Sequence, residues 1–197
     1  MSDEFLEGDE RDRAGMARLV AGDDAALNDL MERHAPKLFN YLVRSVQNEE
    51  DAADLAQDTF VRIFQNCARF DARMKFSTWL YAIATNLVRD CYRYRMRHPQ
   101  VSLDEASGED FRQSMPEQKQ TPSESLQSAE RAEAVRHAVR QLPEELREPL
   151  IFSEYEELSH AEIGEILGCS AKAVETRLYR ARNRLRVKLT GFLDYSP

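Results

Sequence analysis

Aromatic and cationic side chains alternate along one stretch of the chain, residues 76–97. It holds Phe76, the single tryptophan Trp79 and Tyr81. It then carries a row of arginines at Arg89, Arg93, Arg95 and Arg97. Rings on which bases stack, interleaved with cations that follow phosphates, are what a protein needs to bind single-stranded nucleic acid. An amphipathic core helix with a solvated basic face is the alternative, and this stretch alone supports the two equally.

A second basic segment lies near the C-terminus, within a different pattern. Ser159 and Glu162 form a capping box, which begins a helix that should end at Gly168. Ser170 then caps a second helix, which extends past Arg186. Two helices joined by a turn with glycine, the second of them basic, predict a helix-turn-helix. A helical hairpin with a solvated basic side is the alternative, and the agreement of cap, turn and charge favours DNA.

The second helix separates apolar from polar positions. We predict a buried stripe of Val174, Leu178, Ala181 and Leu185. The opposite face would then point outward, as a recognition helix does in a major groove. This outward face comprises Lys172, Glu175, Thr176, Tyr179, Arg180 and Asn183. On the flanks, where phosphates are contacted, lie Arg177, Arg182, Arg184 and Arg186.

Carboxylates recur at helical spacing in an expected helix at 49–66. Asp51, Asp54 and Asp58 stand at i, i+3 and i+7, with Gln57 beside them, and so share one stripe. A metal site is one interpretation, but carboxylates one turn apart on a single helix make a poor cage. A solvated face is the second. A docking stripe for a basic partner is the third, and the rest of the chain favours it.

These elements must be positioned by two helical domains. The chain has 197 residues, with seven glycines, seven prolines, 42% apolar and 31% charged residues, which favours an all-α fold. Periodicity disappears between residues 98 and 128, where proline, serine and acidic residues predict a flexible linker. We therefore expect an acidic N-terminal extension at 1–24, a helix bundle at 25–97 and a C-terminal domain at 129–193.

Within the bundle we expect a helix at 24–47, which Pro36 should kink or split. A short loop at 67–75 should lead into the aromatic helix. The helix between them should turn an apolar face inward. That face comprises Ala52, Ala56, Phe60, Ile63 and Phe64.

Charge and the reactive residue types exclude several function classes. The net charge of −8 is unevenly distributed, because the basic residues gather at 89–97 and 172–188. Three cysteines and four histidines are scattered, which argues against disulfides, a metal site or a cofactor. No signal peptide or apolar span is found, so we expect a cytoplasmic protein without membrane insertion.

Two motifs, in this order, resemble the extracytoplasmic-function sigma factors. Residues 51–60 and 76–86 are similar to the second conserved domain of that family. Leu142-Pro143 and residues 176–182 are similar to the fourth. The resemblance implies a dissociable, non-enzymatic subunit of bacterial RNA polymerase that selects promoters in a stress or envelope-signal response. It also implies an anti-sigma factor as a regulator.

The resemblance further assigns roles to residues. Docking on the clamp helices of the polymerase's largest subunit would fall to Asp51, Asp54, Gln57 and Asp58. Capture of the melted −10 element would fall to Phe70, Lys75, Trp79, Tyr81, Asn86, Arg89 and Arg93, although Trp79 and Tyr81 could instead pack inside the bundle. Reading of the −35 duplex would fall to Lys172, Glu175, Thr176, Arg177, Tyr179, Arg180, Arg182 and Arg184.

One position departs from the family pattern. Many relatives carry a cation where this chain has Glu175. A carboxylate there would accept a hydrogen bond from cytosine rather than bind guanine, which predicts an unusual −35 sequence.

Two alternative functions remain open for the whole chain. One is a stand-alone helix-turn-helix regulator with a dimerising or ligand-binding bundle, and the other is an enzyme built on the three aspartates.

Overall fold

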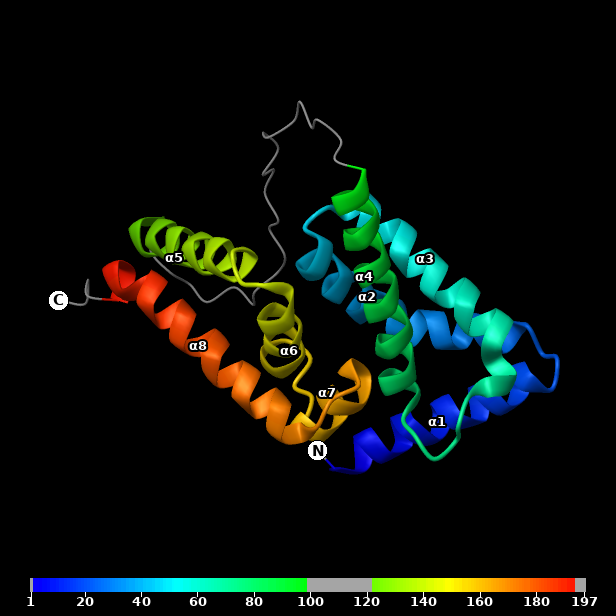
Figure 1. The fold of residues 1–197 in the computed structure, drawn as a ribbon. Coiled ribbons are helices and arrows are strands. Elements are labelled where there is room, and N and C mark those ends of the chain that lie inside the picture. Colours follow the sequence, from blue (N-terminus) through cyan, green and yellow to red (C-terminus); the bar gives the residue numbers. More distant parts are fainter. Residues whose placement is uncertain (1, 99–121, 194–197) are drawn as a thin grey trace.

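The computed structural model describes residues 2–98 and 122–193, and these form helices without a strand. The all-α prediction is therefore confirmed. The first region contains α1 (Ser2–Val20), α2 (Ala25–Val46), α3 (Glu49–Asn66), a short 3₁₀ turn η1 (Cys67–Arg69) and α4 (Phe76–Arg97). The second contains α5 (Pro122–Arg140), α6 (Glu144–Glu154), α7 (His160–Leu167) and α8 (Ala171–Leu193) (Figure 1).

The expected linker is only partly described. Residues 99–121 lie outside the described part of the chain. Helix α5 begins at Pro122, inside the range that composition assigned to the linker, and proline is well suited to the first position of a helix. The C-terminal helices therefore begin earlier than residue 129.

The N-terminal bundle packs α2, α3 and α4 around a shared apolar core. Leu38, Tyr41, Ile63 and Leu80 are each at most 1% exposed. Helix α3 is capped by Asn48, whose side chain accepts a hydrogen bond from the backbone N–H of Asp51 at 2.8 Å. The acidic first turn of α3 also complements the helix dipole.

The structure differs from two expectations about this bundle. Pro36 lies inside α2 without splitting it, and Leu30 and Leu38 on either side of it are both fully buried. Phe64 is 43% exposed rather than inward-facing. Successive i+4 positions drift by about 40° around a helix, so Phe64 has rotated out of the face that Ala52 and Phe60 define.

Helix α1 belongs to the bundle, although its residues were expected to form an extension. Met16 and Leu19 are 1% and 3% exposed and pack with the core of α2. Asp12 is 5% exposed and accepts hydrogen bonds from Arg33 at 3.0 Å and from His34 at 2.7 Å. The folded N-terminal region therefore begins before residue 25.

The helix-turn-helix forms as its local signals predict. Ser159 and Glu162 cap each other's backbone N–H groups, at 3.3 and 2.9 Å. Helix α7 ends at Gly168, whose φ of 66° favours glycine. Ser170 then accepts from the N–H of Ala173 at 3.2 Å and begins α8. Three of the four residues predicted for the buried stripe of α8 are at most 1% exposed, and the fourth is half-buried: Val174, Leu178, Ala181 and Leu185.

The two regions pack against each other. Helix α7 contacts α4, and α6 contacts α2, so that in Figure 1 the orange α7 lies beside the green α4 and the yellow α6 lies beside α2. One continuous cluster of buried apolar residues extends across both regions. This packing fixes the surroundings of α4.

Candidate nucleic-acid interface

The outer face of α8 is open to solvent. The apolar stripe turns it outward, and Tyr179 in particular is 68% exposed. Exposed with it are Lys172, Glu175, Thr176 and Arg180, while Asn183 is half-buried. The helix thus presents hydrogen-bonding groups at the spacing at which a recognition helix meets base edges.

Two residues of this face form an ion pair. Lys172 Nζ lies 2.8 Å from Glu175 Oε2. The hydrogen bond from Lys172 and its charge lower the pKa of Glu175, so the carboxylate is ionised at neutral pH. Thr176 donates its hydroxyl to the carbonyl of Lys172 at 2.9 Å. An incoming base therefore meets a neutral pair rather than two independent charges.

The flanking arginines differ in their freedom. Arg182 binds Glu154 of α6 at 2.7 Å, and half-buried Arg177 lies 3.6 Å from the sulfur of Cys169. Arg180 and Arg184 are exposed, and neither forms an ion pair within the described residues. These two arginines are the ones free to bind DNA without first losing a partner.

Helix α3 displays the predicted stripe with one change. Asp54, Gln57 and Asp58 are exposed on one face, and neither aspartate forms an ion pair among the described residues. Asp51 is half-buried and bound to Arg95 of α4, so it holds the two helices together. No group of three or more potential metal ligands occurs in the described part of the chain.

The loop before α4 rests on an aromatic cluster. The ring centroids of Phe70 and Trp79 lie 5.2 Å apart, and Phe76 lies 6.4 Å from Trp79. Trp79 and Phe70 are half-buried against the core, which agrees with the interpretation that Trp79 packs in the bundle. Hydrogen bonds from Arg73, through its side chain and its backbone, lower the pKa of Asp71 to about 2 and brace the loop tip.

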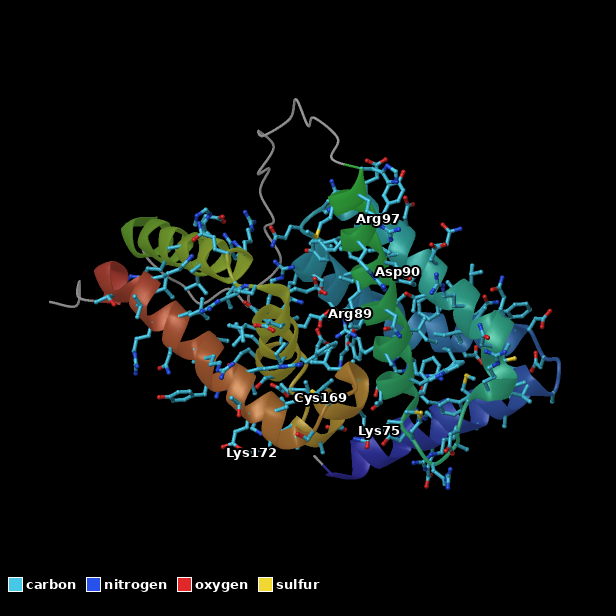
Figure 2. The ribbon with its side chains drawn as sticks, in the orientation of Figure 1. Lys75, Arg89, Asp90, Arg97, Cys169 and Lys172 are labelled. Atoms are coloured by element: carbon cyan, nitrogen blue, oxygen red, sulfur yellow. The ribbon has the colours of Figure 1, made fainter. Side chains whose placement is uncertain are left out.

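The remaining −10 candidates divide into free and bound side chains. Asn86 is exposed, and exposed Arg93 pairs with Asp90 at 2.6 Å. Tyr81, by contrast, is 4% exposed. Three candidates bind carboxylates of the C-terminal region: Lys75 to Glu162, Tyr81 to Glu156, and Arg89 to Glu148. Figure 2 shows Lys75 directly before α4 and Arg89 on α4, both on the side of the C-terminal helices.

Known families match both regions. Residues 30–98 match the model of Sigma-70 region 2, and residues 132–185 match that of Sigma-70, region 4. The chain is 34% identical to the ECF RNA polymerase sigma factor SigW of Bacillus subtilis over 172 residues, which covers 85% of this chain and 91% of the relative. The chain belongs to the extracytoplasmic-function sigma factors. It is an RNA polymerase sigma factor, and the resemblance read from its two motifs is confirmed.

Other sigma factors agree in length and in fold. The RNA polymerase sigma-H factor of Pseudomonas aeruginosa is 30% identical, over 93% of this chain and 96% of the relative. CnrH, solved in complex with the cytosolic domain of CnrY, superposes with a TM-score of 0.65 at 28% identity, covering 95% of this chain and 99% of CnrH. Sigma factor RpoE of Bartonella quintana, bound to the anti-sigma factor NepR, shares the fold with a TM-score of 0.63 at 24% identity, over 83% and 96%.

Several residues of this sigma factor's surfaces were not found from its sequence. The acidic run at 144–165, which supplies Glu148 and Glu156, was not predicted to form contacts, and Glu162 was identified only for its capping box. Asp12 lies before the residues matched by the region 2 model, in a segment taken for an extension. Among the described helices, none has the length and apolarity needed to cross a membrane.

Proposed function

We propose that this sigma factor acts in the cytoplasm by dividing promoter recognition between its two regions. Helix α8 reads the −35 duplex, the loop at 70–75 with α4 captures the melted −10 strand, and α3 docks on core RNA polymerase. The protein supplies no catalytic group, since polymerase carries out the chemistry. The single observation that carries this proposal is the exposed polar face of α8, which a capped helix-turn-helix holds outward in the region matched to Sigma-70 region 4.

The −35 reader combines base and phosphate contacts. Arg180 and Tyr179 project from the centre of the exposed face, where base edges would lie. Arg184 stands one turn further on and suits a phosphate. Lys172 and Glu175 act as a pair, so Glu175 accepts from a cytosine amino group while Lys172 limits the repulsion of the backbone. Thr176, Arg177 and Arg182 complete the surface.

The −10 surface holds an unstacked strand. Asn86 is exposed on α4 and carries an amide that can bond the edge of a flipped base. Lys75, Arg89 and Arg93 supply cations for the strand's phosphates, and Phe70 lies at the entrance of the loop. Trp79 supports Phe70 from beneath rather than stacking on a base, because it packs against the core.

The acidic stripe supplies the polymerase contact. Asp54, Gln57 and Asp58 form an unpaired, exposed face on a helix whose other side is buried, which suits a basic partner surface. An anti-sigma factor is a further expected partner, because the structurally similar CnrH was solved with CnrY, and RpoE of Bartonella quintana was solved with the anti-sigma factor NepR.

Transcription in vitro tests this function. Purified protein is added to bacterial core RNA polymerase on a library of genomic fragments, and transcript starts are mapped. The expected result is a set of starts that share −35 and −10 elements. Starts without a shared upstream element, or palindromic binding sites occupied without polymerase, would instead indicate a stand-alone regulator.

A further inference from the structure

The two helical regions meet across a buried aromatic contact. The ring of Phe152 in α6 stacks on Tyr41 of α2, with centroids 4.6 Å apart, and meets the ring of Tyr81 in α4 edge-on at 5.3 Å. Phe152 and Tyr41 are 0% exposed. Aromatic pairs of this geometry stabilise an interface by more free energy than the burial of their apolar area alone provides. The contact is therefore part of the core of the free protein.

Carboxylates of the C-terminal region surround this contact. Each binds a side chain that the family resemblance assigned to the −10 element, and the proposed function keeps Lys75 and Arg89 in that role. The pairs are Lys75 Nζ with Glu162 Oε1 at 2.8 Å, Tyr81 Oη donating to Glu156 Oε2 at 2.7 Å, and Arg89 Nη2 donating to Glu148 Oε2 at 2.9 Å. Three groups that would bind nucleic acid are thus all occupied from within the chain.

A carboxylate resembles a phosphate to such donors. Lysine and arginine form charge-assisted hydrogen bonds of similar length with either anion. The side chains of Glu148 and Glu156 are only 5% and 7% exposed, and Tyr81 is 4% exposed. The side chains of Lys75 and Arg89 are 47% and 32% exposed, so a strand would have to compete with Glu162 and Glu148 for their charges.

We propose that the C-terminal region of the free protein occupies the part of the −10 surface formed by Lys75, Tyr81 and Arg89, with Glu148, Glu156 and Glu162 in place of DNA, while Asn86 and Arg93 stay exposed. The inference rests on the proposed role of α4 in binding the −10 strand. Closure and strand binding then exclude each other, and each must weaken the other by the same factor.

The other proposed surfaces stay accessible in this closed form. The outer face of α8 is exposed, as are Asp54 and Asp58 of α3. Closure therefore blocks one step, capture of the melted strand, and leaves −35 reading and polymerase docking available.

The closed form also contains a group that favours opening. Glu148 is 4% exposed, and its Oε1 atom has no hydrogen-bond partner among the residues that the structure describes. Burial raises the pKa of Glu148, against the opposing effect of Arg89. An ionised carboxylate with one unsatisfied oxygen is costly to bury, so opening regains hydration for it.

A residue pair outside the DNA surface allows closure to be tested. Arg44 of α2 lies 3.9 Å from Glu156, and its guanidinium group stands 4.3 Å from the ring centroid of Tyr155. Glu156→Lys and Arg44→Glu each place like charges across the interface, whereas the double swap restores opposite charges. Glu157→Lys is the matched control, because Glu157 is an exposed neighbour with the same charge.

Two measurements are made on the full chain. Small-angle X-ray scattering gives the radius of gyration, and fluorescence anisotropy gives the affinity for a short labelled single-stranded DNA of random sequence. Each single variant should have a larger radius and should bind this DNA about tenfold more tightly, since apparent affinity scales with the open fraction. The double swap and Glu157→Lys should behave like the wild type, and circular dichroism unchanged from the wild type shows that the single variants fold.

Either of two outcomes would overturn the proposal. An unchanged radius in both single variants would mean that this interface does not hold the regions together. A larger radius without tighter strand binding would mean that closure does not compete with DNA. Neither result bears on transcription by the wild type with core polymerase, so the proposed function stands or fails separately.

Discussion

The carboxylate of Asp12 in α1 lies 2.7 Å from Nε2 of His34 in α2, and the ring of His34 in turn meets Phe76 edge-on at 4.9 Å. Through these two contacts, α1 is connected to Phe76, the first residue of α4. The same carboxylate binds Arg33 at 3.0 Å. The position of the −10 helix therefore depends partly on a residue of the N-terminal helix.

Replacing Asp12 by asparagine should destabilise the protein by about 1–3 kcal/mol at neutral pH, because charge-assisted hydrogen bonds to a buried carboxylate are lost. Urea denaturation measures the loss. The exposed Asp24, which forms no side-chain cap bond, offers the control Asp24→Asn. Equal stability of the Asp12 and Asp24 variants would show that the Asp12 contacts contribute nothing.

Acid should remove the same stabilisation. Burial tends to raise the pKa of Asp12, but the hydrogen bonds and charges of His34 and Arg33 outweigh it, so the pKa lies below its usual value. The stabilisation is then complete above an ordinary aspartate pKa of about 3.9. It is lost as the pH falls through the lower pKa of the folded protein. The difference in stability between wild type and Asp12→Asn should shrink over that window in urea titrations.

Reversing the charge of α3 should weaken polymerase binding without unfolding the bundle. Asp54→Arg with Asp58→Arg alters only exposed positions, and such changes usually shift stability by less than about 0.5 kcal/mol each. Pull-down of core polymerase measures binding, and circular dichroism monitors the fold. Glu10→Arg with Glu32→Arg gives the same charge change on α1 and α2. Undiminished pull-down by the α3 variant would exclude the docking role.

Removing the Asn86 amide should impair promoter melting alone. The side chain is exposed on α4, so Asn86→Ala leaves the core and α8 unchanged. Permanganate footprinting should show reduced reactivity of unpaired thymines, while duplex binding by the C-terminal region is retained. Normal melting with normal preference among −10 variants would contradict base capture by Asn86.

Replacing Arg180 should change the sequence specificity of −35 binding, whereas replacing Arg184 should change only the overall affinity for duplex DNA. Arg180→Ala should cost about 1–3 kcal/mol on the cognate −35 site and relax one position, as for loss of a bidentate base contact. Arg184→Ala should weaken all duplexes alike and reduce the salt slope by about one. Binding is measured by anisotropy on cognate and scrambled duplexes over a salt series. Identical behaviour of the two variants would refute the assignment.

Gly164 should not tolerate a side chain. A Cβ there would lie 2.6 Å from the carbonyl oxygen of Cys169, a backbone atom of the turn that leads to α8. Gly164→Ala should therefore destabilise the C-terminal region by about 1–3 kcal/mol. Thermal unfolding checks this, with Gly8→Ala as the control, since a Cβ at that position meets nothing within 4 Å. A neutral Gly164→Ala would show that the turn can move aside.

Local signals made the helix-turn-helix predictable. The capping box at Ser159, the stop at Gly168 and the stripe beginning at Val174 are each set by residues within one or two turns. The close approach at Gly164 was not predicted, because it depends on the path of the backbone after the helix. Sequence spacing carries no information on such a clearance.

Contacts between distant segments could not be derived from the sequence. The burial of α1 rests on few apolar residues, Met16 and Leu19 among them, in a strongly charged segment, so composition suggested an extension. Trp79 was left with two interpretations, and only its contact with Phe70 places it in the bundle. Which glutamate of the acidic run meets Arg89 depends on packing between helices far apart in the chain.

The pairing of α4 with the C-terminal glutamates has an evolutionary consequence. Under the proposals above, Lys75, Tyr81 and Arg89 must each suit two alternative ligands, a glutamate of this chain and the promoter strand. A substitution that adapts one of them to a new promoter would also alter the internal pair. Drift at these positions should therefore be slow, and changes should arrive together with a compensating change at Glu148, Glu156 or Glu162. Among close relatives, these compensating changes should be visible as covariation between the α4 positions and the glutamate positions.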